Sequence, residues 1–208
     1  LDEIDDFALA CGAVNTISFF DGRRKGFNTD GPGFVRSLKE KGGFDPKGKR
    51  VFVAGAGGAA RGIVSALAES GAERITVLNR TEEKAVRLAD DVNKRWPGKV
   101  IGGALSEDTV HRALATADLV VNSTKMGMVP KEDETPFDTS FLTPNQFVSD
   151  LIYNPRATKL LREAEKMGCR TLGGLWMLIF QGAEAIRIWT GQEPPVDVMA
   201  EACEHFFS

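Results

Sequence analysis

The chain is poor in the residues that build metal centres, disulfide frameworks and membrane spans. Its 208 residues contain only two histidines and three cysteines. Neither His111 nor His205 has partners at ligand spacing, so we predict no metal site. The cysteines are odd in number and far apart, which favours a reducing compartment, the cytoplasm, over a disulfide framework. No apolar run approaches the roughly 20 residues that a membrane span needs, so we predict no membrane partner.

An excess of basic residues is also absent, which argues against nucleic-acid binding. Acidic residues (29) outnumber basic ones (26), and the formal net charge is −3. The basic residues are scattered rather than gathered in a stripe. The basic cluster "DGRRKG" at 21–26 contains the turn signal Asp21-Gly22, and we interpret it as a solvated hairpin turn. With 42% hydrophobic residues, the composition is that of an ordinary globular protein.

The first thirty residues predict the end of a helix followed by a β-hairpin. The chain begins "LDEIDDFALACGAVNT", without an initiator methionine, a signal peptide or a leading strand, and so starts like the middle of a protein. Residues 2–10 are typical of a helix end. The segments "AVNTISFF" and "KGFNTD", joined by "DGRR", predict the two strands of the hairpin. A helix is predicted next, over 30–42.

From residue 50 onward, strand patterns alternate with helix patterns. Strands are predicted at 50–54, 74–79, 99–105, 118–124 and 146–153. One helix is predicted to follow the glycine-rich stretch after the first of these strands and to end at Gly71. Further helices are predicted at 82–95, 106–117 and 156–167. This alternation predicts an α/β fold with a Rossmann-like doubly wound parallel sheet, covered on both faces. Two further helices are predicted at 174–190 and 196–207. The helix at 174–190 is so apolar in its first half that we expect it to be buried between two structural units rather than on one face of the sheet.

The stretch "GAGGAA" at 55–60 predicts a dinucleotide site. It fits G-x-G-x-x-A directly after a strand and at the start of a helix, with Gly55 for the tight turn, Gly57 for close approach of a pyrophosphate, and Ala60 for helix–strand packing. The phosphates would bind the free N–H groups and the positive end of the helix. A turn that merely tolerates glycine does not need three glycines in four positions. The candidate cofactor residues here are Gly55, Ala56, Gly57, Gly58 and Ala59.

The second strand of this unit ends in Asn79, Arg80 and Thr81, where a NAD-binding unit would carry an acid. A carboxylate there repels a 2′-phosphate, whereas a guanidinium can donate two hydrogen bonds to phosphate oxygens and stack on adenine. The cofactor is therefore predicted to be NADP, with NAD as the alternative. Glu82-Glu83 could turn inward and weaken that preference; we interpret them instead as first-turn acids that complement the helix dipole.

Two Asn-Thr pairs and an aspartate lie on the neighbouring hairpin strands, in "GAVNT" (12–16) and "GFNTDG" (26–31). Amide, hydroxyl and carboxylate groups of this kind suit a polyhydroxylated ligand. The same residue types are those that turns use. The residues alone support both interpretations equally.

Taken together, the motifs resemble those of the shikimate dehydrogenase family, which includes quinate/shikimate dehydrogenases. The resemblance rests on "GAVNT", "G-x-NTDG-x-G", "GAGGAARG", "NRT", "NST-x-x-GM" and "GG-x-x-ML-x-x-QGAEA", in the family's order and approximate spacing. It runs over nearly the whole chain. The segments "STKMGM" and "IYNPRATKLL" are more similar to the quinate/shikimate branch than to the strictly shikimate-specific one.

The resemblance implies an NADP-dependent oxidoreductase that interconverts 3-dehydroshikimate and shikimate, with a small-molecule substrate. It implies that Asp30 is the catalytic-site carboxylate, paired with a lysine for proton transfer. The implied substrate residues are Asn15, Asp30, Tyr153 and Gln181. The alternative for Gln181 is a buried amide satisfied by backbone, but its position after Gly173-Gly174 favours the ligand role. The further cofactor residues that it implies are Thr124 and Lys125 after the fourth strand, and Leu151 and Gly174 beside the nicotinamide.

The chain departs from the family in one large respect. The amino-terminal substrate domain, with its Ser-x-Ser motif and catalytic lysine, has no counterpart here, and Lys25 does not occupy that lysine's motif. We therefore expect residues 1–30 to be the carboxy-terminal hairpin of a substrate domain. Residues 31–173 are expected to form the NADP-binding Rossmann domain, and 174–208 the helices that return to the substrate domain.

This departure leaves two alternatives and one expectation about the isolated chain. The alternatives are a quinate/shikimate dehydrogenase that uses NAD or NADP, and a nucleotide-binding module without catalysis. The chain alone is expected to have little or no shikimate turnover. It is also expected to self-associate, or to need a partner that carries the missing domain. The side chains predicted to expose apolar surface are Phe19, Phe20, Leu175, Ile179, Phe180 and Trp189.

Overall fold

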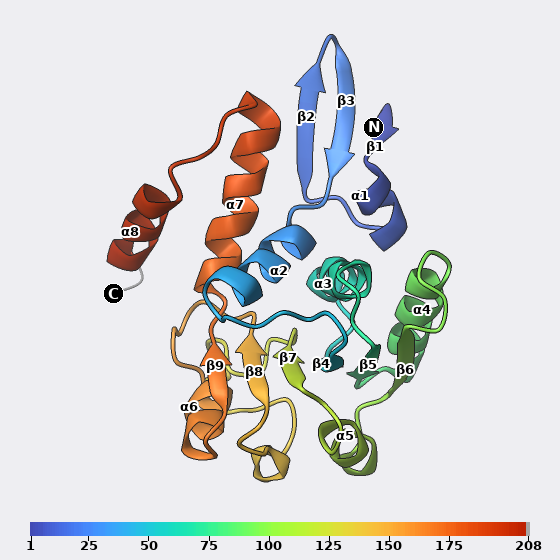
Figure 1. Cartoon of the computed structure of the whole chain (residues 1–208), viewed down its shortest axis with the longest axis vertical. Helices are drawn as coiled ribbons and strands as arrows, with labels where there is room; N and C mark the ends of the chain where they lie inside the picture. The colour runs from blue at the N-terminus through green and yellow to red at the C-terminus, as the bar shows by residue number, and fades with distance from the viewer. Residues whose placement is uncertain (207–208) are drawn as a thin grey trace.

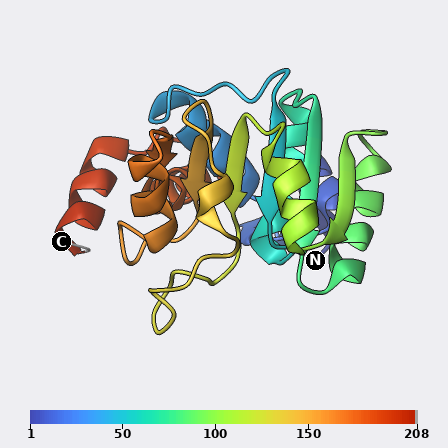
Figure 2. The same cartoon turned by 90° about the horizontal axis from the view of Figure 1, so that it is seen from below.

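A six-stranded parallel sheet forms the centre of the molecule, as the alternating pattern predicts (Figures 1 and 2). The computed structural model describes residues 1–206. The strand order is β6-β5-β4-β7-β8-β9, so the chain runs outward to one side of β4 and then to the other. The strands are β4 (Arg50–Ala54), β5 (Arg74–Asn79), β6 (Val100–Ala104), β7 (Leu119–Asn122), β8 (Phe147–Asp150) and β9 (Arg170–Leu172). The order reverses between β4 and β7, and in such folds ligands bind at that point.

Helices cover both faces of this sheet, which confirms the Rossmann-like class. Alternate residues of β4 show the two faces: Val51 and Val53 belong to one core cluster, Phe52 and Ala54 to the other. One face is covered by α2 (Asp30–Glu40), α3 (Gly58–Glu69) and α4 (Glu82–Asn93). The other is covered by α5 (Glu107–Leu114), α6 (Lys159–Lys166) and the 3₁₀ helix η1 (Thr139–Phe141). None of the helices within residues 1–206 is both long and apolar enough to cross a bilayer.

A small second sheet holds the predicted hairpin, β2 (Thr16–Phe20) and β3 (Arg23–Phe27), which pair antiparallel. The turn uses left-handed backbone at Asp21 (φ 48°) and Gly22 (φ 75°). The prediction for residues 2–10 is partly wrong, because β1 (Glu3–Ile4) is a strand parallel to β3, and α1 covers only Asp6–Cys11. Asp5 sets that helix start, since its carboxylate accepts the N–H of Phe7 at 3.0 Å.

Capping side chains also set where two other helices, α6 and α5, begin. The helix predicted at 156–167 begins at Lys159, because the Thr158 hydroxyl caps it by accepting the N–H of Leu161 at 3.3 Å. The segment after it adds β9 as a sixth strand, paired with β8. Ser106 caps α5 as predicted and forms a reciprocal capping box with Thr109.

The two carboxy-terminal helices are α7 (Leu175–Thr190) and α8 (Val196–Phe206). The prediction that Leu175, Ile179 and Phe180 would be exposed is wrong: they are 6%, 1% and 1% exposed. The reason is that α7 packs against α2 and α8 of the same chain.

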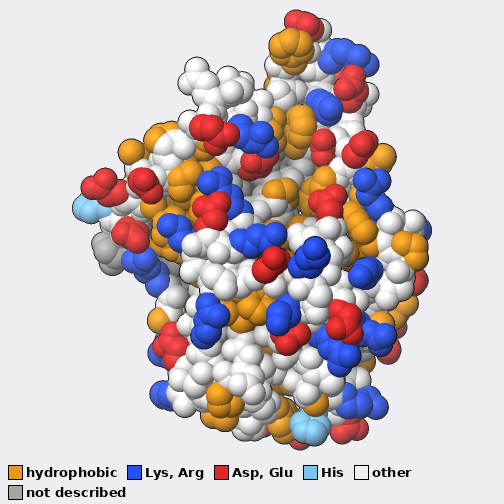
Figure 3. Space-filling view, in the orientation of Figure 1, with side chains coloured by type: hydrophobic (Ala, Val, Ile, Leu, Met, Phe, Trp, Pro, Cys, Tyr) orange, Lys and Arg blue, Asp and Glu red, His pale blue; other side chains and the backbone are white. Residues whose placement is uncertain are grey.

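Three of the predicted apolar side chains do reach the surface. Phe19, Phe20 and Trp189 are 76%, 75% and 58% exposed. Figure 3 shows hydrophobic side chains next to charged ones at the tip of the hairpin. The indole N–H of Trp189 donates to the carbonyl of Ile17 at 2.9 Å, which ties α7 to the hairpin.

Candidate active site

The glycine-rich turn lies between β4 and α3, at the carboxyl edge of the sheet. Gly55 has φ 107°, and a side chain there would meet the Ser123 hydroxyl at 2.6 Å, so the position requires glycine. A Cβ on Gly57 or Gly58 would meet nothing within 4 Å. No side chain caps the start of α3, so its first N–H groups are left uncapped by side chains, as an anion-binding helix start requires. Ala59 and Ala60 pack against the core on the opposite side.

A cavity of 620 Å³ lies in front of this turn. Four cationic side chains and no carboxylate of the described chain line it, so its charge suits phosphate groups. The lining residues are Ala56, Gly57, Asn79, Arg80, Thr81, Lys84, Leu105, Thr124, Lys125, Met126, Lys131 and Pro136.

The end of β5 supplies the cation that the sequence analysis singled out. Arg80 is exposed and faces the cavity. Asn79 donates from Nδ2 to the carbonyl of Thr81 at 2.8 Å and so shapes the turn. Thr81 is the N-cap residue of α4, but its hydroxyl makes no capping bond, which leaves the hydroxyl available to a ligand. Glu82-Glu83 are exposed and line a separate depression on α4, so they do not turn into the cavity.

Sequence reasoning missed several lining residues, including two lysines. Lys84 lies in the first turn of α4, three positions after the N-cap residue Thr81, so the predicted start of this helix could have revealed it. Lys131 lies in the loop between β7 and β8 and forms an ion pair with Glu134 at 3.0 Å. That loop has no periodicity, so the sequence carries no signal for Lys131.

A second group of polar side chains joins the hairpin to α2 and α7. Asn15 accepts the N–H of Thr29 at 2.9 Å and donates from Nδ2 to the Thr29 hydroxyl at 3.1 Å. The Thr29 hydroxyl also lies 3.3 Å from Oε1 of Gln181. Gln181 in turn donates to the carbonyl of Leu178 at 3.0 Å. The fully buried Thr29 is therefore the hub between Asn15 and Gln181. The sequence marked it only as a member of one Asn-Thr pair and gave no sign of its contact with Gln181.

Asp30 is the first residue of α2, next to this hub. It is partly buried, and burial raises the pKa of its carboxyl, while a hydrogen bond from Asn15 opposes that shift. Within residues 1–206 Asp30 forms no ion pair. A carboxylate in such surroundings holds a proton more readily than an exposed one, which suits a group that exchanges protons.

The remaining candidates lie where β8 leads to α6 and where α7 begins. The backbone of Gly174 lies directly against Leu151, so that a Cβ on Gly174 would overlap the Leu151 carbonyl. The N–H of Gly174 donates to the carbonyl of Ile152 at 3.0 Å. Tyr153 is 38% exposed and lines a separate depression of 140 Å³ with Arg156, Gly173, Leu175 and Trp176.

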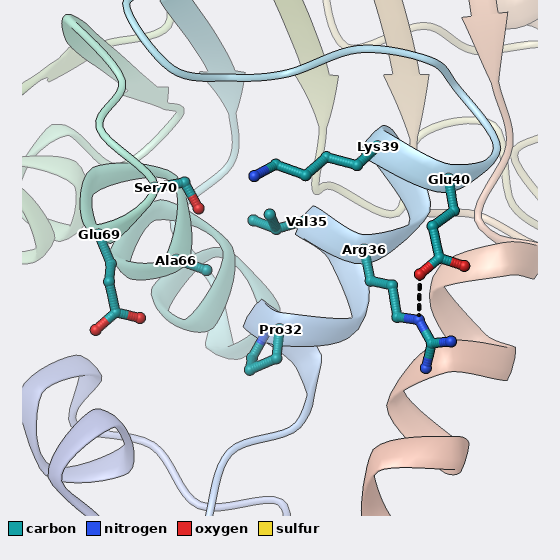
Figure 4. Close-up of a pocket in the computed structure, with 8 residues that line it drawn as sticks. All are labelled: Pro32, Val35, Arg36, Lys39, Glu40, Ala66, Glu69 and Ser70. Atoms are coloured by element: carbon teal, nitrogen blue, oxygen red, sulfur yellow. Dashed lines mark hydrogen bonds and ion pairs between the residues drawn. The ribbon is translucent and has the colours of Figure 1, made fainter. Parts of the chain in front are cut away.

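A further groove of 410 Å³ lies between α2 and α3, away from all of these residues (Figure 4). Its walls carry both signs of charge, and Arg36 pairs with Glu40 at 2.7 Å along α2. None of the candidate site residues lines it. The chemistry-bearing side chains thus gather around the carboxyl ends of the strands and the start of α2.

Comparison with protein families gives matches along much of the chain. The model for shikimate / quinate 5-dehydrogenase matches residues 37–136, and the model for the shikimate 5′-dehydrogenase C-terminal domain matches residues 174–204. The shikimate dehydrogenase (NADP⁺) of Methanopyrus kandleri is 46% identical over 202 residues, which cover 97% of this chain and 70% of that protein.

Solved structures agree with the sequence matches. The shikimate 5-dehydrogenase of Listeria monocytogenes, in complex with shikimate and NAD, superposes with a TM-score of 0.92 at 37% identity, covering 97% of this chain and 71% of that one. The enzyme of Thermus thermophilus, in complex with NADP(H) and shikimate, has a TM-score of 0.84 at 37% identity, covering 99% and 72%. These matches confirm the resemblance, and the chain belongs to the shikimate dehydrogenase family.

Proposed function

We propose that this protein is an NADP-dependent oxidoreductase that interconverts shikimate and 3-dehydroshikimate. The observation that carries the proposal is a cation-lined cavity at the glycine-rich turn of a doubly wound sheet, in a chain that also brings Asn15, Thr29 and Gln181 together beside Asp30. The family relationship supports the same reaction, because relatives are named for it and have been solved with these ligands.

The residues at the cavity fit the cofactor, which supplies the hydride chemistry when bound. The first N–H groups of α3 would bind the pyrophosphate over Gly57 and Gly58, where no side chain intrudes. Arg80 and Thr81 would bind the 2′-phosphate, and Thr124 and Lys125 would close the same cavity. Leu151 and Gly174 would lie beside the nicotinamide.

On the substrate side, Asp30 would accept a hydrogen bond from the reacting hydroxyl and hold its proton at the carboxylate. Asn15 and Gln181 would orient the other ring hydroxyls, and Tyr153 would border the same ligand. In this proposal 31–173 is the cofactor domain, while 1–30 and 174–208 belong to the substrate side. We place the reaction in the cytoplasm, because an odd number of widely spaced cysteines favours a reducing compartment.

The test of the reaction is substrate-dependent reduction of NADP by a chain that also carries an amino-terminal substrate domain, followed by NADPH absorbance, with shikimate and quinate compared side by side. Reduction with shikimate would support the proposal. Equal or faster reduction with quinate would favour a quinate/shikimate dehydrogenase. A protein that binds NADP yet reduces it with neither compound would be a nucleotide-binding module without catalysis.

Replacing Arg80 by alanine is expected to remove most of the preference for NADP over NAD. The guanidinium contributes a charge-assisted contact to the 2′-phosphate, worth about 1.5–3 kcal/mol, or about 10- to 150-fold in affinity. NAD has no phosphate there, so its affinity should change little. Binding of both nucleotides is measured by calorimetric titration.

Arg87→Ala is the matched control, because Arg87 is an exposed arginine on the neighbouring helix that does not line the cavity. It should leave both affinities at the parental values. Equal affinities of the parent protein for NADP and NAD would contradict the proposed role of Arg80.

The exposed aromatic side chains at the hairpin tip are proposed to form a contact with a second copy of the chain. Phe19 and Phe20 are each about three-quarters exposed. As neighbours on β2 they point to opposite faces of the hairpin, and each adds exposed apolar surface of the kind that promotes association. Light scattering over a dilution series should therefore detect self-association of the chain. Replacing both residues by serine should give a monomer, and a parent protein that is monomeric at all concentrations would contradict the proposal.

A further inference from the structure

A buried carboxylate occupies the end of β8, behind both groups of candidate residues. Asp150 is 0% exposed. Its Oδ1 accepts hydrogen bonds from Nδ2 of Asn122 at 3.0 Å and from the N–H of Ile152 at 3.1 Å, and its Oδ2 accepts one from the Thr158 hydroxyl at 2.8 Å. All three partners are donors, so the site is built for an acceptor-only group.

One arm of this network leads to the loop that lines the cofactor cavity. Asn122, also 0% exposed, donates to the carbonyl of Met126 at 3.1 Å. Its Oδ1 accepts from the N–H and the hydroxyl of Thr124 at 2.9 and 2.7 Å. The Thr124 hydroxyl then accepts the N–H of Met126 at 3.1 Å. Thr124 and Met126 both line the cavity.

The other arm leads to the start of α7. Asp150 holds the N–H of Ile152, and the carbonyl of Ile152 accepts the N–H of Gly174 at 3.0 Å. Gly174 precedes α7, the helix that carries Gln181. The Thr158 hydroxyl, which binds the other carboxylate oxygen, also caps α6. One side chain therefore connects the cavity loop, the segment after β8 and the helix on the substrate side.

We propose that Asp150 is a positioning residue that keeps the Thr124–Met126 loop and the start of α7 in a fixed relation, so that the nicotinamide end of the cofactor is aligned. Burial without a neighbouring cation raises the pKa of this carboxyl. The three convergent donors oppose that shift, because each of them favours the ionised form of the carboxyl. This inference rests on the proposed binding of NADP.

Asp150→Asn tests the role, because it keeps the shape of the side chain but points an amide N–H₂ at a hydrogen-bond donor. Two ligands are titrated: NADP, and adenosine 2′,5′-bisphosphate, which lacks the nicotinamide. Misalignment of the loop and of the start of α7 should lose about one hydrogen bond to the nicotinamide end, worth about tenfold in affinity, so NADP should bind about tenfold more weakly. The bisphosphate, held by Arg80 and its neighbours, should bind within about twofold of the parent.

Gln146→Glu is the matched control, at the residue directly before the same strand. Gln146 is 3% exposed, and its amide donates to the carbonyl of Leu114 at 2.7 Å. The change is also isosteric and buried, so it should lower the melting temperature while leaving the ratio of the two affinities unchanged. If Asp150→Asn does not fold, Thr158→Val removes one donor to the same carboxylate. It should likewise weaken the binding of NADP while leaving the affinity for the bisphosphate nearly unchanged.

Equal weakening of both ligands, or no weakening of NADP, would overturn the positioning role. Failure of the parent protein to bind either ligand would overturn the proposed function, and this inference with it.

Discussion

Asp30→Asn is expected to lower kcat for shikimate by about 100-fold or more, the usual scale for a positioned acid–base group. An amide keeps the size of the side chain and its place at the start of α2, but it cannot take up the proton of a reacting hydroxyl. Affinity for NADP should stay at the parental value, because Asp30 does not line the cofactor cavity. Steady-state kinetics in a preparation that turns over shikimate, together with NADP titration, measures both quantities.

The same substitution is expected to stabilise the fold at neutral pH. Burial raises the pKa of Asp30 above 3.8, so the folded state binds its proton more tightly than the unfolded state does. The stability that this group contributes is therefore fully present below about pH 3.8 and is lost as the pH rises through the folded pKa. Asparagine removes that loss, which is about 1.4 kcal/mol for every tenfold difference in proton affinity between the two states. Melting curves at several pH values would show the gain at pH 7 and its disappearance in acid.

Asp45→Asn provides a control of opposite sign. Asp45 lies in an exposed loop, where the backbone N–H of Lys47 lowers the pKa of its carboxyl. Its replacement should not stabilise the protein at pH 7 and should leave turnover unchanged. If Asp30→Asn kept near-parental turnover, Asp30 would serve only the start of α2 and have no part in the chemistry.

Gly174→Ala is expected to cost at least about 3 kcal/mol of unfolding free energy, at the upper end of overpacking effects. A methyl group on Gly174 would overlap the carbonyl of Leu151 and crowd Ile152. These are backbone atoms, which cannot move aside as a side chain can. For a chain of this size the melting temperature should fall by roughly 6–12 °C.

Gly58→Ala is the matched control, because a methyl group there meets nothing within 4 Å. It should leave the melting temperature within about 2 °C of the parent, since alanine favours the helix that starts at this residue. A Gly174→Ala protein as stable as Gly58→Ala would mean that α7 can shift away from β8, contrary to the close packing found here.

The regular elements could be predicted from the sequence because their signals are local. Residues 50–54 show the pattern of a buried strand, and Asp21-Gly22 marks the hairpin turn. Contacts between distant segments could not be predicted in this way. β1 exists only because Glu3 and Ile4 pair with β3, and no periodicity of two residues can show that.

The residues of the candidate site also fall into two groups: those that a local pattern predicts and those that depend on contacts between distant segments. Arg80 could be singled out because its distance from the glycines is fixed by one β-α-β unit. Thr29 and Lys131 could not, since the first depends on α7 lying beside the hairpin and the second on the path of an irregular loop. Likewise, Phe180 was expected at the surface, but α2 covers it, with Arg36 over its ring at 4.4 Å.

The hydrogen bond between Thr29 and Gln181 spans 152 residues of sequence, and this sets the order in which the two halves of the site can assemble during synthesis. Strands β4 to β8 and the glycine-rich turn are complete before α7 is made. At typical rates of about 5–20 residues per second, Thr29 precedes Gln181 by roughly 8–30 s. Once β8 has been made, a nascent chain can already form the nucleotide cavity, whereas the pocket on the substrate side forms only after α7 has been synthesised.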